Sequence, residues 1–325
     1  MQRRHLLTAT AILVTCLLPA AAQAQDPANW PTRPVRMLVG SAPGGGTDAM
    51  ARAVADRLAP LLKQPVLVEN RPGVSNTMAV DVTAKSTDGH TMVMGVVTAH
   101  AIAPHLLKLG YDNNKDLVPV AFVGSVPNVL VVGNSVPVNS VAELVALAKK
   151  QPGQINFASS GTGSTQHIAA EVFKDAAGIA ITHVPYKGSA GALVDLVSGQ
   201  VQMSFDTMPS VIGQIKAGKL RALAVTSPQR NPQLPQVPTM AEAGLPSVAI
   251  SAWYGIYMPA ATPKAVQQKV HDEVNKVIAM PETKSRLEAV GAELRPMSQP
   301  DFGSFHLAEY QRFGEIIRKN NIKLD

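Results

Sequence analysis

The chain has 325 residues, a formal net charge of +6, 4% aromatic residues and a single cysteine. The basic surplus is small and scattered, and aromatic side chains are too few to build stacking platforms, so the composition argues against a nucleic-acid partner. The length is sufficient for two domains, each with its own hydrophobic core.

The N-terminal segment 1–24 has the pattern of a secretory signal peptide. A pair of arginines at positions 3–4 is followed by an apolar stretch and by an A-x-A motif that ends at Ala24. We expect cleavage after Ala24 and export to the periplasm as a soluble protein. The paired arginines also resemble a twin-arginine signal, so both export routes stay open. Cleavage would remove Cys16, and the mature chain would then have neither disulfides nor a thiolate nucleophile.

Beyond this segment, short apolar runs alternate with amphipathic stretches. We expect strands at residues 35–40, 66–69, 91–97, 118–123, 129–132, 155–158, 181–184, 201–205 and 220–225. We expect helices at residues 47–62, 140–149, 165–177, 209–217, 263–279 and 282–290, and a long final helix from residue 300. Several of the strands are apolar throughout, which is typical of parallel strands covered on both faces. The alternation predicts an α/β fold of doubly wound, mainly parallel sheets.

Two segments, 125–127 and 251–257, are candidates for crossings between domains, because each lies at or beside a strand-like run. They divide the chain into two lobes. Lobe 1 is discontinuous and comprises residues 25–126 plus 252–325, and lobe 2 comprises residues 127–251.

The first of two glycine-rich loops reads PGGGTD at residues 43–48, between an expected strand and an expected helix. Successive glycines let backbone N–H groups converge on one point, and the helix N-terminus adds its positive dipole end. This pattern predicts a site for one carboxylate, although a tight strand–helix turn without a ligand would have the same sequence. We expect Asp48 to face away from the ligand and to pair with Arg52. The predicted ligand-binding residues of this loop are Pro43, Gly44, Gly45, Gly46 and Thr47.

The second loop, residues 159–165, reads SSGTGST and also joins an expected strand to an expected helix. It combines backbone N–H groups with several hydroxyls that would donate to a carboxylate. Neither loop matches a nucleotide-binding motif, because the G-x-G of the second loop continues to Gln166 where glycine is required. The predicted ligand-binding residues of this loop are Ser159, Ser160, Gly161, Thr162, Gly163, Ser164 and Thr165.

The sequence does not decide the roles of two charged residues outside the loops. Asp206 follows an expected strand and is a candidate contact for a ligand hydroxyl, a ligand amine or a bridging water, although as a lone carboxylate it would repel an anion. Lys187 either lends positive potential to the site or is an ordinary solvated lysine.

Catalytic and metal-binding patterns are weak. The chain has no G-x-S-x-G elbow and no H-E-x-x-H motif, and His100 with His105 have the wrong helical spacing to share a metal ion. We therefore expect neither a catalytic residue nor a metal or cofactor. An exported hydrolase using Ser160 or Ser164 with His167 is the enzymatic alternative, but the neighbouring sequence offers no third member of a triad. For His167 we expect hydrogen bonding or helix capping rather than base catalysis.

Several stretches, taken in order, resemble one known family across essentially the whole mature chain. They are PGGGTD (43–48), VENRPG (68–73), PNVLVV (127–132), FASSGTGSTQH (157–167), HVPYKGSA (183–190), GQVQMSFD (199–206), IKAGKLRALAVTS (215–227), VPTMAEAGLP (237–246) and residues 253–263. The chain resembles the Bug family, the extracytoplasmic solute receptors of tripartite tricarboxylate transporters.

The resemblance implies a two-lobe periplasmic-binding-protein fold of the type II flytrap class. It implies that residues 43–48 and 159–165 hold the ligand carboxylates. It also implies delivery of the ligand to a large and a small integral membrane subunit, and we expect the receptor itself to be a monomer. A sensor of the same fold that serves a signalling partner is an alternative that the sequence leaves open.

The chain departs from the family pattern at three places near the expected pocket. Ser41 and Ala42 stand where an aromatic residue is frequent, residues 73–76 read GVSN where A-G-G-N commonly follows the P-G pair, and Ala103 replaces an asparagine. Family members take dicarboxylates, tricarboxylates, acidic amino acids or aromatic carboxylates, and these departures leave the choice among them open.

Overall fold

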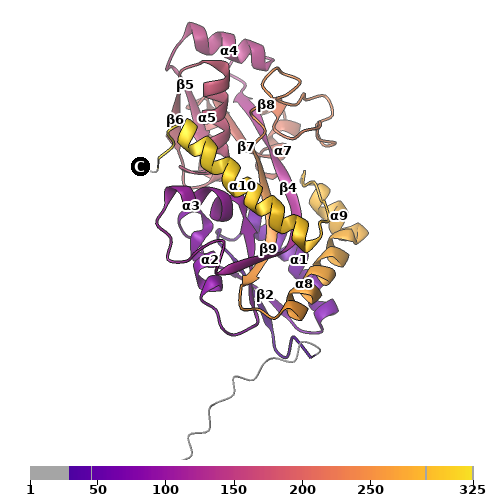
Figure 1. Cartoon of the computed structure of the whole chain (residues 1–325). Coiled ribbons are helices and arrows are strands. Elements are labelled where there is room, and N and C mark those ends of the chain that lie inside the picture. The colour runs from indigo at the N-terminus through magenta and orange to yellow at the C-terminus, as the bar shows by residue number, and fades with distance from the viewer. Residues whose placement is uncertain (1–28, 45, 290, 324–325) are drawn as a thin grey trace, which may run out of the picture.

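The structure, a computed structural model, describes residues 29–44, 46–289 and 291–323. The predicted signal peptide and Gly45 lie outside the described residues. Figure 1 shows an elongated molecule with two lobes stacked along its long axis, and the long helix α10 (Gln299–Lys319) running along one side. Among the described residues, no helix is both long and apolar enough to cross a membrane.

Nine strands form a single curled sheet. In chain order they are β1 (Val35–Val39), β2 (Val66–Asn70), β3 (Thr91–Val96), β4 (Leu117–Gly133), β5 (Ile155–Ser159), β6 (Ile181–Pro185), β7 (Met203–Thr207), β8 (Leu220–Val225) and β9 (Ser251–Pro259). Their spatial order is β2-β1-β3-β9-β4-β7-β5-β6, and β8 also pairs with β4. The outer strands of each lobe are parallel to one another, whereas β4, β8 and β9 join by antiparallel pairing.

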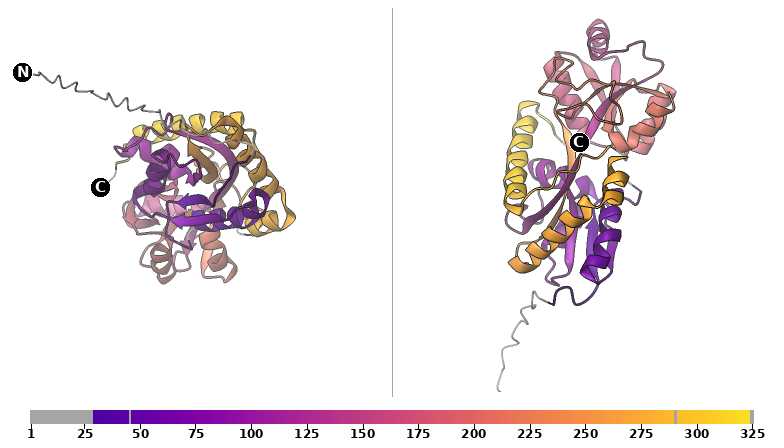
Figure 2. Two further views of the ribbon diagram at one scale, coloured as in Figure 1. Left: turned by 90° about the horizontal axis from the view of Figure 1, so that it is seen from below. Right: turned by 90° about the vertical axis from the view of Figure 1, so that its right-hand side faces the viewer.

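Helices cover both faces of the sheet in each lobe. They are α1 (Gly46–Leu62), α2 (Thr77–Ala84), α3 (Ala103–Leu106), α4 (Val141–Lys150), α5 (Thr165–Ala177), α6 (Ser189–Ser198), α7 (Met208–Lys216), α8 (Lys264–Ala279), α9 (Pro281–Glu288) and α10. A short 3-10 turn, η1 (Val74–Asn76), and a π-helical segment, η2 (Thr98–Ile102), complete the described elements. Helices α1 and α8 pack together on lobe 1, and α10 packs against β4 and η2. A view from below and a view from the side show helices around the sheet as well (Figure 2).

The predicted α/β fold is confirmed, and the expected strands and helices appear with small shifts at their ends. Burial explains the sequence pattern, because all six residues of β3 are buried between helical layers. Ser140 caps α4 and accepts a hydrogen bond from the backbone N–H of Glu143. Helix α5 ends as expected at Gly178, which has a left-handed backbone.

The crossing between the lobes differs from the sequence prediction. The two expected strands at 118–123 and 129–132 are one continuous strand, β4, which pairs with β9 up to Pro127 and with β7 from Asn128 onward. The segment 251–257, expected only as a crossing, belongs to the nine-residue strand β9 in the middle of the sheet. Both lobes therefore share one hydrogen-bonded core at the crossing.

A third segment strengthens this crossing. The backbone N–H of Ser125 donates to the carbonyl oxygen of Glu293 at 3.0 Å, and the N–H of Glu293 donates back to Ser125 at 2.7 Å. Buried Asn128 donates through its side chain to the carbonyl oxygen of Ile250 at 2.8 Å. The crossing is therefore made of β4, β9 and the segment that follows α9.

Candidate functional site

The strand directions bring two sets of loops face to face. In lobe 1 the carboxyl end of β3 lies beside the crossing, because Val96 pairs with Tyr254 and Tyr254 pairs with Gly124 of β4. In lobe 2, β7 runs in the opposite direction, and Asp206 at its carboxyl end pairs with Val129. The positions on β4 that mark these two strand ends, Gly124 and Val129, are five residues apart, roughly 17 Å at the usual rise of a strand. The loops that follow the parallel strands of the two lobes therefore face each other across the crossing.

The loop after β1 is organised around Asp48. The Asp48 carboxylate accepts hydrogen bonds from Gly44 N at 2.9 Å, from Arg52 Nε at 3.0 Å and from Asn70 Nδ2 at 2.9 Å. Burial alone would raise the pKa of Asp48, but these hydrogen bonds outweigh burial and lower the pKa below its ordinary value. The expected pairing of Asp48 with Arg52 is confirmed.

This network changes one part of the sequence interpretation. The Gly44 N–H is already bonded to Asp48, so it does not point freely at a ligand as a converging triple glycine would require. Gly44 has a φ of 81°, in the left-handed region that favours glycine. Within the described part of this loop, the remaining donors are the first N–H groups of α1, at Gly46 and Thr47, which a helix leaves without intrahelical partners.

Tyr254 of β9 is a candidate site residue that the sequence analysis did not include. A Cβ atom placed on Gly46 would lie 3.4 Å from the Tyr254 hydroxyl oxygen, so this hydroxyl lies beside the start of α1. The ring is buried, and burial raises the pKa of Tyr254 to about 12. Tyr254 therefore stays protonated and offers an O–H donor at the base of the loop.

Residues 75–76 and 98 lie in lobe 1 beside the end of β1, from which the first loop begins. Ser75 and Asn76 both have positive φ values, 51° and 65°, which is uncommon for non-glycine residues. The Asn76 side chain donates to the Thr98 hydroxyl at 3.0 Å, and Gly40 at the end of β1 packs so tightly on Asn76 that a Cβ there would overlap it. One family departure noted in the sequence, G-V-S-N, thus lies next to the first loop.

The loop after β5 uses part of its polar groups to hold itself. Ser159 is fully buried, and its hydroxyl lies 2.7 Å from His183 Nε2 and accepts from Gly161 N at 3.1 Å. Ser164 caps α5 and accepts from His167 N at 3.2 Å. The Ser160 hydroxyl has no hydrogen bond to any described residue and is half-buried, which leaves it for a ligand.

His167 is bound to the backbone of this loop. Its Nδ1 accepts a hydrogen bond from Gly163 N at 3.2 Å, and its ring stacks on His183 at a centroid distance of 4.0 Å. The predicted hydrogen-bonding role of His167 is therefore confirmed. Ser164 meets the backbone N–H of His167 and not its ring, so these two residues do not form a nucleophile–base pair.

Asp206 lies behind this loop and is fully buried. Its Oδ1 accepts hydrogen bonds from Gln166, Ser189 and Thr207, and burial raises the pKa of its carboxyl group. The sequence left its role open, and the structure places it one hydrogen bond from the first turn of α5.

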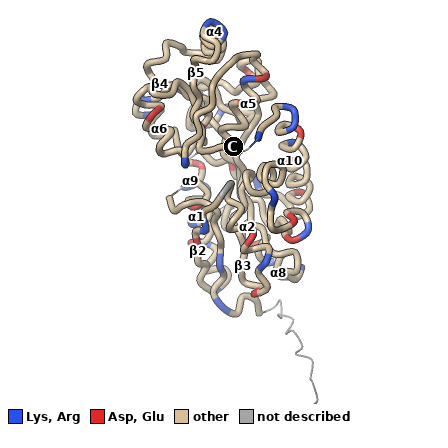
Figure 3. The backbone as a smooth tube through the Cα atoms, turned by 90° about the vertical axis from the view of Figure 1, so that its left-hand side faces the viewer, with Lys and Arg blue, Asp and Glu red and all other residues tan. Residues whose placement is uncertain are grey.

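The basic residues near the loops are exposed or paired. Lys187 is exposed, Arg71 lies 3.5 Å from Glu69, and Arg52 is bonded to Asp48. Figure 3 shows Lys and Arg interspersed with Asp and Glu over both lobes. Backbone N–H groups and hydroxyls are therefore the main donors that the described loops present to an anion.

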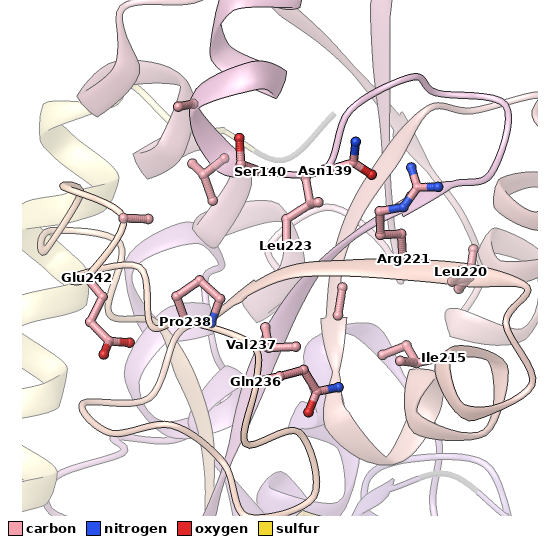
Figure 4. A pocket seen from close by; sticks show the side chains of 14 residues that line it. Asn139, Ser140, Ile215, Leu220, Arg221, Leu223, Gln236, Val237, Pro238 and Glu242 are labelled. Atoms are coloured by element: carbon pink, nitrogen blue, oxygen red, sulfur yellow. The ribbon is translucent and has the colours of Figure 1, made fainter.

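A cavity of about 610 Å³ lies elsewhere in lobe 2, at the end of β8 farthest from the crossing. Figure 4 shows Asn139 and Arg221 on one side of it and Glu242 on the other. Arg221 donates to the carbonyl oxygens of Val136 and Val138, and α4 is capped by its own Ser140, so these polar groups are used within the protein. This cavity is therefore a weaker candidate for an anion site than the facing loops.

Comparisons with known proteins identify relatives over the whole chain. A family model described as "Tripartite tricarboxylate transporter family receptor" matches residues 50–322. Protein BugT of Bordetella pertussis is 36% identical over 330 residues, which cover 100% of both chains. A protein from Pseudomonas sp. strain P51, encoded in the tcbD-tcbE intergenic region, is 34% identical over 97% of this chain and 94% of its own length.

Solved structures agree with this assignment. Rpa4515 of R. palustris, solved with adipate, has a TM-score of 0.85 and 36% identity over 91% of this chain and 100% of that chain. MatC of Rhodopseudomonas palustris, solved with bound malate, has a TM-score of 0.80 and 30% identity over 89% of this chain and 100% of that chain. The chain therefore belongs to the family of tripartite tricarboxylate transporter receptors, the solute-binding proteins that include the Bug proteins.

Proposed function

We propose that this protein is a periplasmic receptor that captures a small dicarboxylate between its two lobes and delivers it to the membrane subunits of a tripartite transporter. The observation that carries the proposal is the pair of loops, 43–47 and 159–165, which face each other from opposite lobes and each end at a helix N-terminus. One ligand carboxylate binds the start of α1, and the other end of the ligand meets the serine-rich loop before α5.

The ligand class rests on chemistry and on the relatives. Helix N-termini and hydroxyls bind carboxylates without needing a buried cation, and adipate and malate, which two similar structures contain, are both dicarboxylates. The lobes that close on the ligand are residues 25–126 plus 252–325 and residues 127–251, with the ligand loops on either side of the crossing. Export by the N-terminal segment 1–24 and partnership with a large and a small membrane subunit belong to the same proposal.

A thermal-shift screen of the purified protein against small mono-, di- and tricarboxylates tests the proposal. Ligand binding to the native state raises the melting temperature, by an amount that grows with ligand concentration over Kd. Calorimetry on the best ligand then gives Kd. We expect a dicarboxylate to produce the largest shift.

The variant Gly46→Val tests the proposed site. The backbone of Gly46 is not in the left-handed region and the nearest atom to an added Cβ is at 3.4 Å, so the variant should fold. Its branched side chain should keep a carboxylate from the N–H groups of α1 and weaken binding at least tenfold, about 1.4 kcal/mol. Gly213→Val, at an exposed glycine of α7 with open space around it, is the matched control and should bind normally. Equal affinity in both variants would remove the first loop from the site.

A further inference from the structure

Asp206 occupies a convergence point of three helices in lobe 2. Its Oδ1 accepts from Gln166 Nε2 at 3.2 Å, from Ser189 Oγ at 2.8 Å and from the backbone N of Thr207 at 2.7 Å. Gln166 is in the first turn of α5, Ser189 is the first residue of α6, and Thr207 is the N-cap of α7. Helices α5 and α7 both pack against β7, which carries Asp206, and they lie on either side of it in Figure 1.

Each helix N-terminus carries roughly half a positive charge, so the convergence of three is an anion-binding arrangement. The protein fills it with a carboxylate of its own. Because α5 begins directly after the serine-rich loop, Asp206 lies one hydrogen bond behind the proposed docking place of the ligand.

The Asp206 carboxylate has no cationic partner within the part of the chain that the structure describes. Its second oxygen, Oδ2, is buried and accepts no hydrogen bond of good geometry from the described residues, although the Ser210 hydroxyl lies close enough to lower the pKa of the Asp206 carboxyl group. A buried acceptor without a donor is unfavourable, and more so when it is charged. A proton on Oδ2, or a donor brought by the ligand, would relieve this.

The neighbouring titratable groups do not donate a hydrogen bond to Oδ2 of Asp206. Glu171 is paired with Lys174, Asp195 accepts from the Tyr186 hydroxyl at 2.6 Å, and Lys216 donates to Gln233. On β4, the residue opposite Asp206 is the apolar Val129. Asp175 of α5 is paired with Lys319, and the remaining titratable residues nearby are His167, His183 and the exposed Lys187.

We propose that Asp206 is the charge selector of lobe 2: a ligand end that is neutral or donates hydrogen bonds docks there directly, whereas a second carboxylate enters only together with one proton. This inference rests on the proposed function. Two carboxylates that share a site of low dielectric cannot both stay ionised, so one of them takes a proton from solvent. Oδ1 already accepts three hydrogen bonds, and the proton therefore goes to Oδ2.

Two isosteric probes test the selector, adipate and adipic acid monoamide, which differ by one charge. Between about pH 6.5 and pH 8.5 the free carboxylates of both probes are ionised, since ordinary carboxyl pKa values are near 4. Calorimetry in two buffers of different ionisation enthalpy measures the protons taken up on binding. For the wild-type protein we expect adipate binding to take up as much as one proton and to weaken by up to tenfold per pH unit, whereas monoamide binding is independent of pH.

The variant Asp206→Asn keeps the side-chain shape and removes the charge. We expect it to bind adipate at least tenfold more tightly than wild type at pH 8.5 and to take up no proton. Glu242→Gln removes an exposed charge elsewhere in lobe 2 and should behave like wild type. Should Asp206→Asn fail to fold, the difference in proton uptake between the two probes on the wild-type protein still tests the selector.

Binding of adipate without proton uptake, with no gain in the Asn variant, would overturn the selector and leave the receptor function standing. Failure of both probes to bind either protein would overturn the dicarboxylate function, and the selector with it.

Discussion

At the scale of single residues, the position of Tyr254 gives it a role that its neighbours on β9 do not have. Its hydroxyl lies beside Gly46, whereas the hydroxyl of Tyr257, three residues along the strand, is 2.9 Å from His306 Nδ1. Both rings are buried in the same core. The two tyrosines therefore form a matched pair in which one faces the proposed site and the other serves the fold.

We expect Tyr254→Phe to weaken carboxylate binding while it leaves the free energy of unfolding nearly unchanged. A hydrogen bond to a charged group contributes about 1.5–3 kcal/mol, so the loss of affinity should be roughly ten- to one-hundred-fold. Tyr257→Phe should do the reverse, lowering stability and leaving affinity intact. Calorimetry with the ligand and urea unfolding of both variants measure the two effects, and a Tyr254→Phe variant of normal affinity would exclude this hydroxyl as a ligand contact.

Lys187 should act on the rate of binding more than on affinity. It is exposed and its side chain makes no hydrogen bond or ion pair with the described residues, so its charge acts through solvent over about one Debye length, near 8 Å at physiological salt. Lys187→Ala should slow association at low salt, and the difference from wild type should vanish at about 1 M salt. Stopped-flow fluorescence at two salt concentrations measures this, and loss of binding at all salt concentrations would instead make Lys187 a direct contact.

At the scale of elements, a buried histidine pair ties α10 to lobe 1. His306 of α10 contacts the Tyr257 hydroxyl and Asn114, and His100 of η2 contacts Asn113 at 2.8 Å and stacks on Tyr257 at 3.7 Å. Burial lowers the pKa of His100 to about 3 and that of His306 to about 4. Both side chains are therefore neutral in the folded protein at neutral pH.

This pair predicts acid sensitivity. An unfolded histidine has a pKa near 6.5, so between about pH 6.5 and pH 4 the unfolded chain binds more protons and the free energy of unfolding falls as the pH falls. Each histidine adds a slope of up to about 1.4 kcal/mol per pH unit in this window. The variant His306→Gln should be less stable at pH 7 but should lose less stability on acidification. Urea unfolding at pH 7, 6 and 5 measures the slopes, and equal slopes in both proteins would contradict the assignment.

The elements also show how far the sequence alone could reach. Local patterns predicted the alternation of strands and helices and the Asp48–Arg52 pair, because periodicity and helix starts are encoded locally. The assignment of the two glycine-rich loops to the ligand stays a prediction. Residues 251–257 were interpreted as a crossing between lobes although their aromatic residues favour a strand, and only the pairing with β3 and β4 makes them part of the central strand β9.

The same distinction applies to the site. Gly44 looked like a free donor because the acceptor that binds it, Asp48, is recognised only from the folded turn. Tyr254 and the Asn76–Thr98 contact lie far in sequence from the loops that they adjoin. Asp206 was found from its place after a strand, but the convergence of three helix starts on it depends on the topology of the whole lobe.

At the scale of the whole molecule, two ligand loops in different lobes share one ligand only if the lobes approach each other. We expect hinge bending near Pro127 and Ser251, where β4 leaves β9 for β7. Small-angle scattering should show a smaller radius of gyration at saturating ligand than without ligand. The Gly46→Val variant should keep the larger radius under the same conditions, and an unchanged profile of the saturated wild type would contradict closure.

The insertion of β9 between β3 and β4 also governs the order in which the two lobes fold. Val93 pairs with Tyr257 although all of lobe 2 lies between them in sequence. Until residues 251–259 arrive, β3 and the first half of β4 have unpaired edges, which are prone to stick to other chains. Such long-range pairing is slow to form. Lobe 2 is therefore able to fold before lobe 1, so the lobe that is translated first is completed last. A chain truncated before β9 would retain a folded lobe 2, and its lobe 1 would have open, aggregation-prone strand edges.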